Sequence, residues 1–324
     1  MNISNCRSVK KIFDDSTFNK IDRKKLEFDD KKLNIFFENG IINYSLVEIV
    51  GSCGSGKTQF ALTLCAEQLL KIFDENKNIS DSDLKEKKKE NIIFYIYINR
   101  MFPMHRLIEI IEKKMQERER NENKNYIDEN KFKDNNVHNN SIRENNFNKN
   151  SSSKNYFDEK QFNYSFKRDL KRILKNLYIQ KVNDDKDFFL LFEKHIFYIL
   201  KYYKISLLII DSINSIFNAN QMLDNHKKNQ LFIKISLILK KISYENNFFV
   251  LLINSLYIKK EYSDFSFNIA DYIISSSCAN TILFFKKMKK NNEIMRKIII
   301  QYSEFLSKYK TLEFEITDKG FNVL

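Results

Sequence analysis

Tryptophan is absent from this chain, proline occurs once, and glycine occurs only five times among its 324 residues. Lysine, asparagine, isoleucine, phenylalanine and tyrosine are correspondingly abundant. This profile is typical of an AT-rich coding bias, which enriches lysine whatever the protein does. The formal net charge of +13 therefore has two interpretations, an anionic partner such as nucleic acid or the coding bias alone.

Cysteines are also few, and their positions argue against two kinds of site. The four of them, Cys6, Cys53, Cys65 and Cys278, are widely spaced, and none belongs to a C-x-x-C pair. This spacing disfavours a zinc site and a dithiol redox motif, and without a secretory leader we expect a reducing compartment. No apolar run reaches the roughly 20 residues of a membrane-spanning helix, so we expect no membrane association.

Hydrophobic residues make up 43% of the chain, and 29 residues are phenylalanine, which supports a sizeable core. Apolar runs typical of buried strands alternate with segments of helical period, which predicts βαβ units and a mostly parallel sheet. The predicted strands are 45–50, 92–98, 177–182, 205–210 and 248–255, and the predicted helices are 58–73, 188–203 and 228–245. Three further strand candidates follow, at 281–287, 296–303 and 312–321. We therefore predict an α/β fold with helices flanking the sheet and a strand-rich C-terminal edge.

The domain organisation is one core with two interruptions. Residues 1–25 are too few for a separate domain, and residues 26–324 form the core. Within it, residues 74–90 are a charged insertion without apolar periodicity. Residues 116–165 are rich in Asn, Lys and Glu, and we expect a low-complexity, solvated insertion there.

The most informative motif is GSCGSGKT at residues 51–58, which fits the P-loop pattern G-x-x-x-x-G-K-[ST]. It follows a predicted strand and opens a predicted helix, and it contains three of the five glycines. Such a loop wraps a phosphate chain with its backbone N–H groups, and the helix adds its positive dipole end. The residues expected to bind nucleotide here are Gly51, Ser52, Cys53, Gly54, Ser55, Gly56, Lys57, Thr58 and Gln59. Lys57 places a charge on the β- and γ-phosphates, and Thr58 can ligate Mg²⁺.

A P-loop ATPase also needs a carboxylate near the metal and a group that activates water. Asp211, which ends the apolar strand ISLLIID, is expected to be that carboxylate, although a helix cap is an alternative role. The position after the strand 92–98, where RecA-type proteins carry the catalytic Glu, is Asn99. An amide can hold water but cannot accept its proton, so slow or absent hydrolysis is expected. A shifted register, with Glu109 as the acid, is the alternative.

These motifs together resemble the RecA/RadA-type eukaryotic strand-exchange recombinases and their paralogs. The resemblance rests on LVEIVGSCGSGKTQFALTLC, on MFPMHRL, on LLIIDSINSIF and on FFVLLINS, where Asn254 matches the family. It covers residues 26–324 apart from the two insertions. It implies a RecA-like P-loop NTPase core that binds ATP and Mg²⁺, with Thr58 and Asp211 at the metal.

The same resemblance implies further roles. Arg106 would stack on the adenine, although it could equally be a solvated helix arginine. DNA-binding loops would fall near 218–228 and 257–268, and the second carries Lys259 and Lys260, which a plain surface loop could also carry. The implied function is homologous-recombination repair in the nucleus, in a hetero-oligomer with a recombinase and another paralog on single-stranded or branched DNA.

Departures from the family pattern favour an accessory paralog over a self-sufficient filament. Asn99 replaces the catalytic Glu, Ser255 replaces the Gln that usually follows Asn254, and no N-terminal helical DNA-binding domain is expected. Two other classes stay open. One is a nucleotide-bound scaffold subunit that does not hydrolyse ATP, and the other is a P-loop kinase, which would need a lid with several arginines.

Overall fold

The computed structural model describes residues 24–77, 89–98, 100–134, 165–219, 225–255, 278–290 and 293–324. Nine of the strands in these ranges form a single sheet, in the order β11-β10-β9-β8-β3-β7-β6-β4-β5. The strands are β3 (Leu46–Gly51), β4 (Glu90–Ile98), β5 (Leu177–Val182), β6 (Tyr203–Asp211), β7 (Phe249–Ser255), β8 (Thr281–Lys290), β9 (Glu293–Ser303), β10 (Thr311–Thr317) and β11 (Gly320–Val323). A separate two-stranded sheet pairs β1 (Lys25–Leu26) with β2 (Ile41–Ile42).

The nine-stranded sheet has a parallel part and an antiparallel part. The six strands β8-β3-β7-β6-β4-β5 run parallel to one another. β9, β10 and β11 then follow β8 as an antiparallel edge. The predicted α/β architecture, with a mostly parallel sheet and a strand-rich C-terminal edge, is confirmed.

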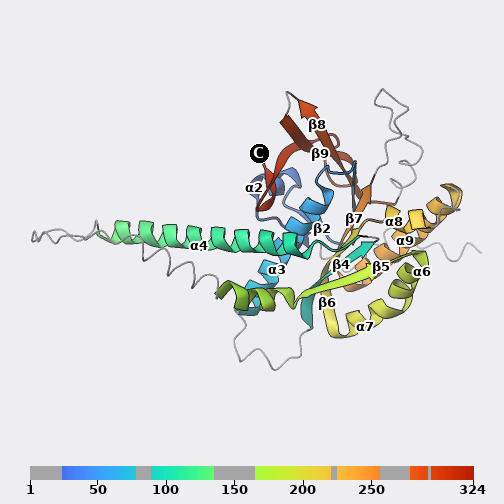
Figure 1. Ribbon diagram of the computed structural model, residues 1–324, viewed down its shortest axis with the longest axis horizontal. Helices are drawn as coiled ribbons and strands as arrows, with labels where there is room; N and C mark the ends of the chain where they lie inside the picture. The colour runs from blue at the N-terminus through green and yellow to red at the C-terminus, as the bar shows by residue number, and fades with distance from the viewer. Residues whose placement is uncertain are drawn as a thin grey trace, which may run out of the picture.

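Helices cover both faces of the sheet (Figure 1). One face packs against α2 (Lys31–Phe36), α3 (Lys57–Lys77), the start of α4 (Met104–Asp134) and the helix at 165–174. The other face packs against α6 (Asp185–Leu190), the π-helical turn η3 (Leu191–His195), α7 (Ile196–Tyr202), α8 (Asn214–Ala219) and α9 (Asn225–Asn246). Because both faces are covered, β3 is buried along its whole length, as its apolar sequence predicted.

The boundaries of the two insertions need correction. α3 continues to Lys77 and β4 begins at Glu90, so the ends of the 74–90 insertion belong to regular elements, and 78–88 lies outside the described residues. α4 is 31 residues long and extends away from the body (Figure 1), so residues 116–134 are helical. Glu, Lys, Gln and Arg are strong helix formers, and a helix needs no apolar stripe where it leaves the core. Residues 135–164 lie outside the described residues.

Candidate nucleotide-binding site

The candidate site lies where β3, β4 and β6 end. Ligands of open α/β sheets bind at the carboxyl ends of the strands, and the ends of these three strands, with β7 between β3 and β6, supply the motif residues there. A cavity of about 370 Å³ opens between them. Its lining residues are Cys53, Gly54, Gly56, Lys57, Thr58, Gln59, Tyr95, Tyr97, Arg100, Met101, Pro103, Asp211, Ser212 and Ile316. The glycine loop and Asp211, which are far apart in the sequence, therefore face one cavity.

Glycine is required in the loop by both backbone angle and space. Gly56 has a φ of 106°, a conformation that L-residues rarely adopt, and a Cβ atom there would lie 2.9 Å from the ring of Phe314. A Cβ atom on Gly51 would lie 2.4 Å from the carbonyl oxygen of Phe285 on β8. The core is packed closely against the loop at these two positions. A larger residue at either one would displace the loop from the strands beneath it.

Lys57 is the first residue of α3, and its side chain folds back over the glycine loop. Its ammonium donates hydrogen bonds to the carbonyl oxygens of Gly51, at 2.7 Å, and of Ser52, at 2.8 Å. Burial lowers the pKa of Lys57 to about 8, and the nearby carboxylate of Asp211 opposes that change. A buried cation whose hydrogen bonds within the described residues go to carbonyl oxygens is suited to an anionic ligand, which would return it to full charge.

Thr58 and Asp211, the two residues predicted to ligate Mg²⁺, line the cavity next to each other. The Thr58 hydroxyl donates to Asp211 Oδ2 at 2.7 Å. Burial raises the pKa of Asp211, although hydrogen bonds from Thr58 and Tyr95 oppose that rise. Among the described residues, no group of three or more His, Cys, Asp or Glu side chains could hold a metal. One hydroxyl and one carboxylate suit Mg²⁺, which keeps several waters and binds phosphate oxygens as well.

Tyr95 is a site residue that the sequence did not reveal. It lies on β4, is only 1% exposed, and donates its phenol hydroxyl to Asp211 Oδ2 at 3.2 Å. The ring of Phe102 packs edge-on against it, with ring centroids 4.8 Å apart. A tyrosine in an apolar strand looks like a core residue, and only the pairing of β4 with β6 brings its hydroxyl to Asp211.

Arg106 and Gln59 are hydrogen-bonded to each other beside the cavity. Arg106 Nε donates to Gln59 Oε1 at 2.9 Å, and its terminal nitrogens donate to Glu109 and to the carbonyl oxygens of Thr317 and Asp318. The guanidinium therefore ties α4 to α3 and to the turn between β10 and β11. Glu109 is engaged by Arg106 and does not line the cavity, so its placement gives no support to the alternative of a shifted catalytic acid.

Glu48 and Asn254 form a polar pair in the middle of the sheet. Glu48 lies on β3 and is 0% exposed, and it accepts a hydrogen bond from Asn254 Nδ2 at 2.7 Å. Burial raises the pKa of Glu48 to about 7, and the Asn254 hydrogen bond opposes that change. The remaining oxygens, Glu48 Oε2 and Asn254 Oδ1, are buried without a hydrogen-bond partner among the described residues. A protonated Glu48 carries an O–H group, which can donate a hydrogen bond between these two oxygens.

Several predicted residues lie outside the described ranges. Asn99 is one, and the loop 257–268 with Lys259 and Lys260 is another. The other predicted DNA-binding loop needs correction, because residues 218–219 belong to α8 and 225–228 to α9. Of that range, only 220–224 falls outside the description.

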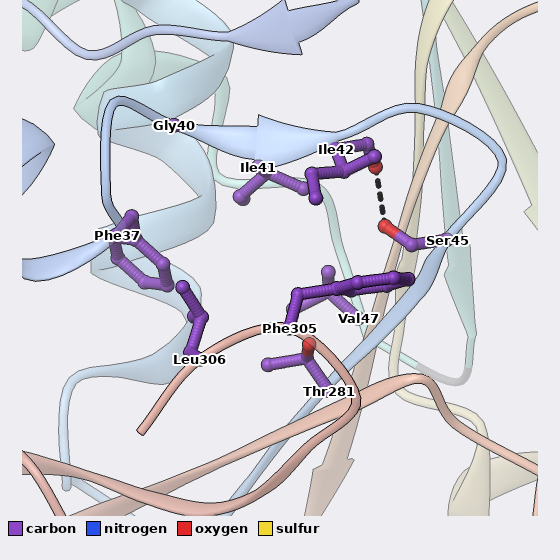
Figure 2. Close-up of a pocket in the computed structure, with 9 residues that line it drawn as sticks. All are labelled: Phe37, Gly40, Ile41, Ile42, Ser45, Val47, Thr281, Phe305 and Leu306. Carbon is purple, nitrogen blue, oxygen red and sulfur yellow. Dashed lines mark hydrogen bonds between the residues drawn. The ribbon is translucent and has the colours of Figure 1, made fainter. Parts of the chain in front are cut away.

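A second cavity, at the opposite end of β3, has no features of a ligand site. It measures about 20 Å³, and Figure 2 shows it between Phe37, Ile41, Phe305 and Leu306. The Ser45 hydroxyl at its rim donates to the carbonyl oxygen of Ile42. Such a volume holds a single water at most, and its lining is mainly apolar. We regard it as a small packing gap.

Comparison with known protein families finds no matching family model, and comparison with curated proteins finds no match. Within the part of the chain that the structure describes, no helix is both long and apolar enough to cross a membrane.

Proposed function

We propose that this chain is an ATP-binding protein of the RecA/RadA recombinase type that acts as a recombinase paralog. The observation that carries the proposal is the Thr58–Asp211 hydrogen bond of 2.7 Å beside a glycine loop whose lysine is buried. In this arrangement the loop would hold the phosphates, while Thr58 and Asp211 would hold Mg²⁺, which neutralises phosphate charge when bound.

The assignment to recombinases within P-loop proteins rests on sequence resemblance. FPMHRL at residues 102–107 is most similar to the third X-ray-repair cross-complementing paralog, which carries a Phe-Pro pair at this point. β7, which carries Asn254 and ends at Ser255, lies directly between β3 and β6 in the sheet, with Ser255 opposite Gly51 and Ile253 opposite Asp211, which supports a place for this strand beside the nucleotide. The resemblance implies support of a recombinase filament on single-stranded DNA during double-strand-break repair in the nucleus.

Slow hydrolysis is part of the proposal. Among the described residues that line the cavity, Asp211 supplies the one carboxylate, and it already accepts hydrogen bonds from Thr58 and Tyr95. A carboxylate committed to the metal is a poor candidate for the water-activating base. Asn99, at the position typical of the catalytic Glu, points to the same conclusion. A scaffold subunit that binds ATP without turnover is therefore the second candidate.

The nucleotide site can be tested through Cys53, which is exposed and lines the cavity. Mg-ATP is expected to slow its alkylation by iodoacetamide, measured by mass spectrometry of the labelled peptide. In a Lys57→Met variant the protection should disappear, while the buried Cys65 provides an internal reference for intact folding. Equal labelling of the native chain with and without Mg-ATP contradicts nucleotide binding at this loop.

The cellular role needs two further measurements. ATPase turnover stimulated by single-stranded DNA supports a working recombinase-type motor, whereas binding without turnover supports the scaffold. Affinity purification should recover a recombinase or a second paralog. Saturable phosphate transfer to a small acceptor would instead support the kinase, for which the described cavity lining offers Arg100 as its one arginine.

A further inference from the structure

β8 runs past the end of the strand that leads into the glycine loop. β3 ends at Gly51, directly opposite Phe285, whereas β8 continues for five more residues to Lys290. Alternate residues of a strand share a face, so Lys287 follows Phe285 on the face that packs against α3. The Lys287 ammonium lies 3.5 Å from the point that a Cβ atom on Gly54 would occupy. A second lysine therefore flanks the glycine loop.

Among the described residues, no carboxylate pairs with the two cations of this face, Lys287 and Arg296. Arg296 on β9 lies directly opposite Lys287, and its other cross-strand neighbour is Phe314. Like charges in directly opposed positions destabilise a sheet. Within the described ranges, Arg296 Nε is buried without a hydrogen-bond partner, and no residue there makes an ion pair or hydrogen bond with Lys287.

The opposite face of the same hairpin shows a different pattern. There Lys286 also lies directly opposite a second cation, Lys297, but the other cross-strand neighbour of Lys297 is Glu313 on β10, so a carboxylate adjoins that pair. Coding bias alone does not explain this difference, since it acts on both faces alike. The unbalanced pair is the one beside the glycine loop, where an anion would relieve the repulsion.

We propose that Lys287, with Arg296 behind it, is a second cationic contact for the polyphosphate of the bound nucleotide. Lys57 approaches the phosphates from α3, and Lys287 approaches from β8 on the outer side of the loop. The inference rests on the proposed nucleotide binding and extends it, because it assigns a phosphate-binding role to the β8–β9 hairpin. Since Lys287 is exposed, its contribution is screened by salt more strongly than that of the buried Lys57.

The test compares two lysines of one strand. Lys287→Met and Lys289→Met remove the same charge from exposed positions on the same face of β8, but Lys289 lies about 7 Å further along. Dissociation constants for ATP, ADP and AMP are measured by titration of the full chain at low and high salt. Lys287→Met should weaken ATP binding about three- to ten-fold, with smaller losses for ADP and AMP. Lys289→Met should change ATP binding less than two-fold, and Lys287→Arg should restore it.

The outcomes separate this inference from the proposal on which it rests. If Lys57→Met abolishes ATP binding but Lys287→Met behaves like Lys289→Met, the loop binds nucleotide and the role of Lys287 is wrong. An effect of Lys287→Met that is equal for ATP and AMP, or unchanged at high salt, also overturns it. If the native chain binds no nucleotide, both proposals fail. Unchanged circular dichroism should accompany the substitutions of the exposed Lys287, and Lys287→Met, which removes the repulsion with Arg296, should not lower Tm.

Discussion

The buried carboxyl of Glu48 is expected to make folding stability depend on pH in a way that one substitution removes. In the unfolded chain its pKa is near 4.5, and burial raises it to about 7 in the folded protein. Between these values the native state binds the proton more tightly, so the stabilising contribution of neutral Glu48 is complete below pH 4.5 and is lost as pH rises through 7.

The magnitude follows from the two pKa values. At 1.36 kcal/mol per pKa unit, ionisation of Glu48 at pH 8 would lower the free energy of unfolding by about 3 kcal/mol relative to pH 4.5. Glu48→Gln keeps the shape and stays neutral, and its amide can donate to Asn254 Oδ1 while its oxygen accepts from Asn254 Nδ2. The variant should therefore match the native chain near pH 4.5 and exceed it by up to about 3 kcal/mol at pH 8.

The assay is urea unfolding followed by circular dichroism at a series of pH values from 4.5 to 8.5. All other titrating groups are shared, so the difference between Glu48→Gln and the native chain isolates Glu48. Glu48→Leu is the control, because it leaves Asn254 Nδ2 unpaired and should lower stability relative to Glu48→Gln at every pH. A difference between Glu48→Gln and native protein that stays constant over the range refutes a protonated, buried Glu48.

Two further substitutions test contacts at the site and between the helices. Tyr95→Phe removes one hydrogen bond to Asp211 and should weaken Mg-ATP binding about five-fold while leaving Mg-free ATP binding unchanged, as titrations with and without the metal can determine. An equal loss in both titrations would mean that Tyr95 does not act through Asp211 and a metal bound there. Lys114→Met removes the 2.8 Å ion pair with Glu67, which is 4% exposed, and should cost about 3 kcal/mol of unfolding free energy because it leaves a buried carboxylate unpaired. The neighbouring Lys113→Met breaks only an exposed pair with Asp318 and should cost less than about 1 kcal/mol, so comparable losses in the two variants would contradict the reasoning.

The local elements of the fold were predictable because they depend on periodicity. The buried helix face with Phe60, Leu64 and Leu69 and the apolar strand before Asp211 follow from the spacing of apolar residues. The glycine loop was predictable because its backbone conformation tolerates few residues other than glycine. α4 was not among the predicted helices, and its outer part could not be predicted from periodicity, because a charged helix that leaves the core carries no apolar period.

The sequence by itself determined the strands of the main sheet, the helices with an apolar period and the loop that fits the P-loop pattern, since these depend on neighbouring residues along the chain. The tertiary structure alone decided that Tyr95 reaches Asp211, that Glu48 faces Asn254 and that Lys287 lies beside Gly54. Each of these contacts joins segments whose distance is set by strand order and register. Strand order and register come from packing a whole sheet between two layers of helices, which no local pattern encodes.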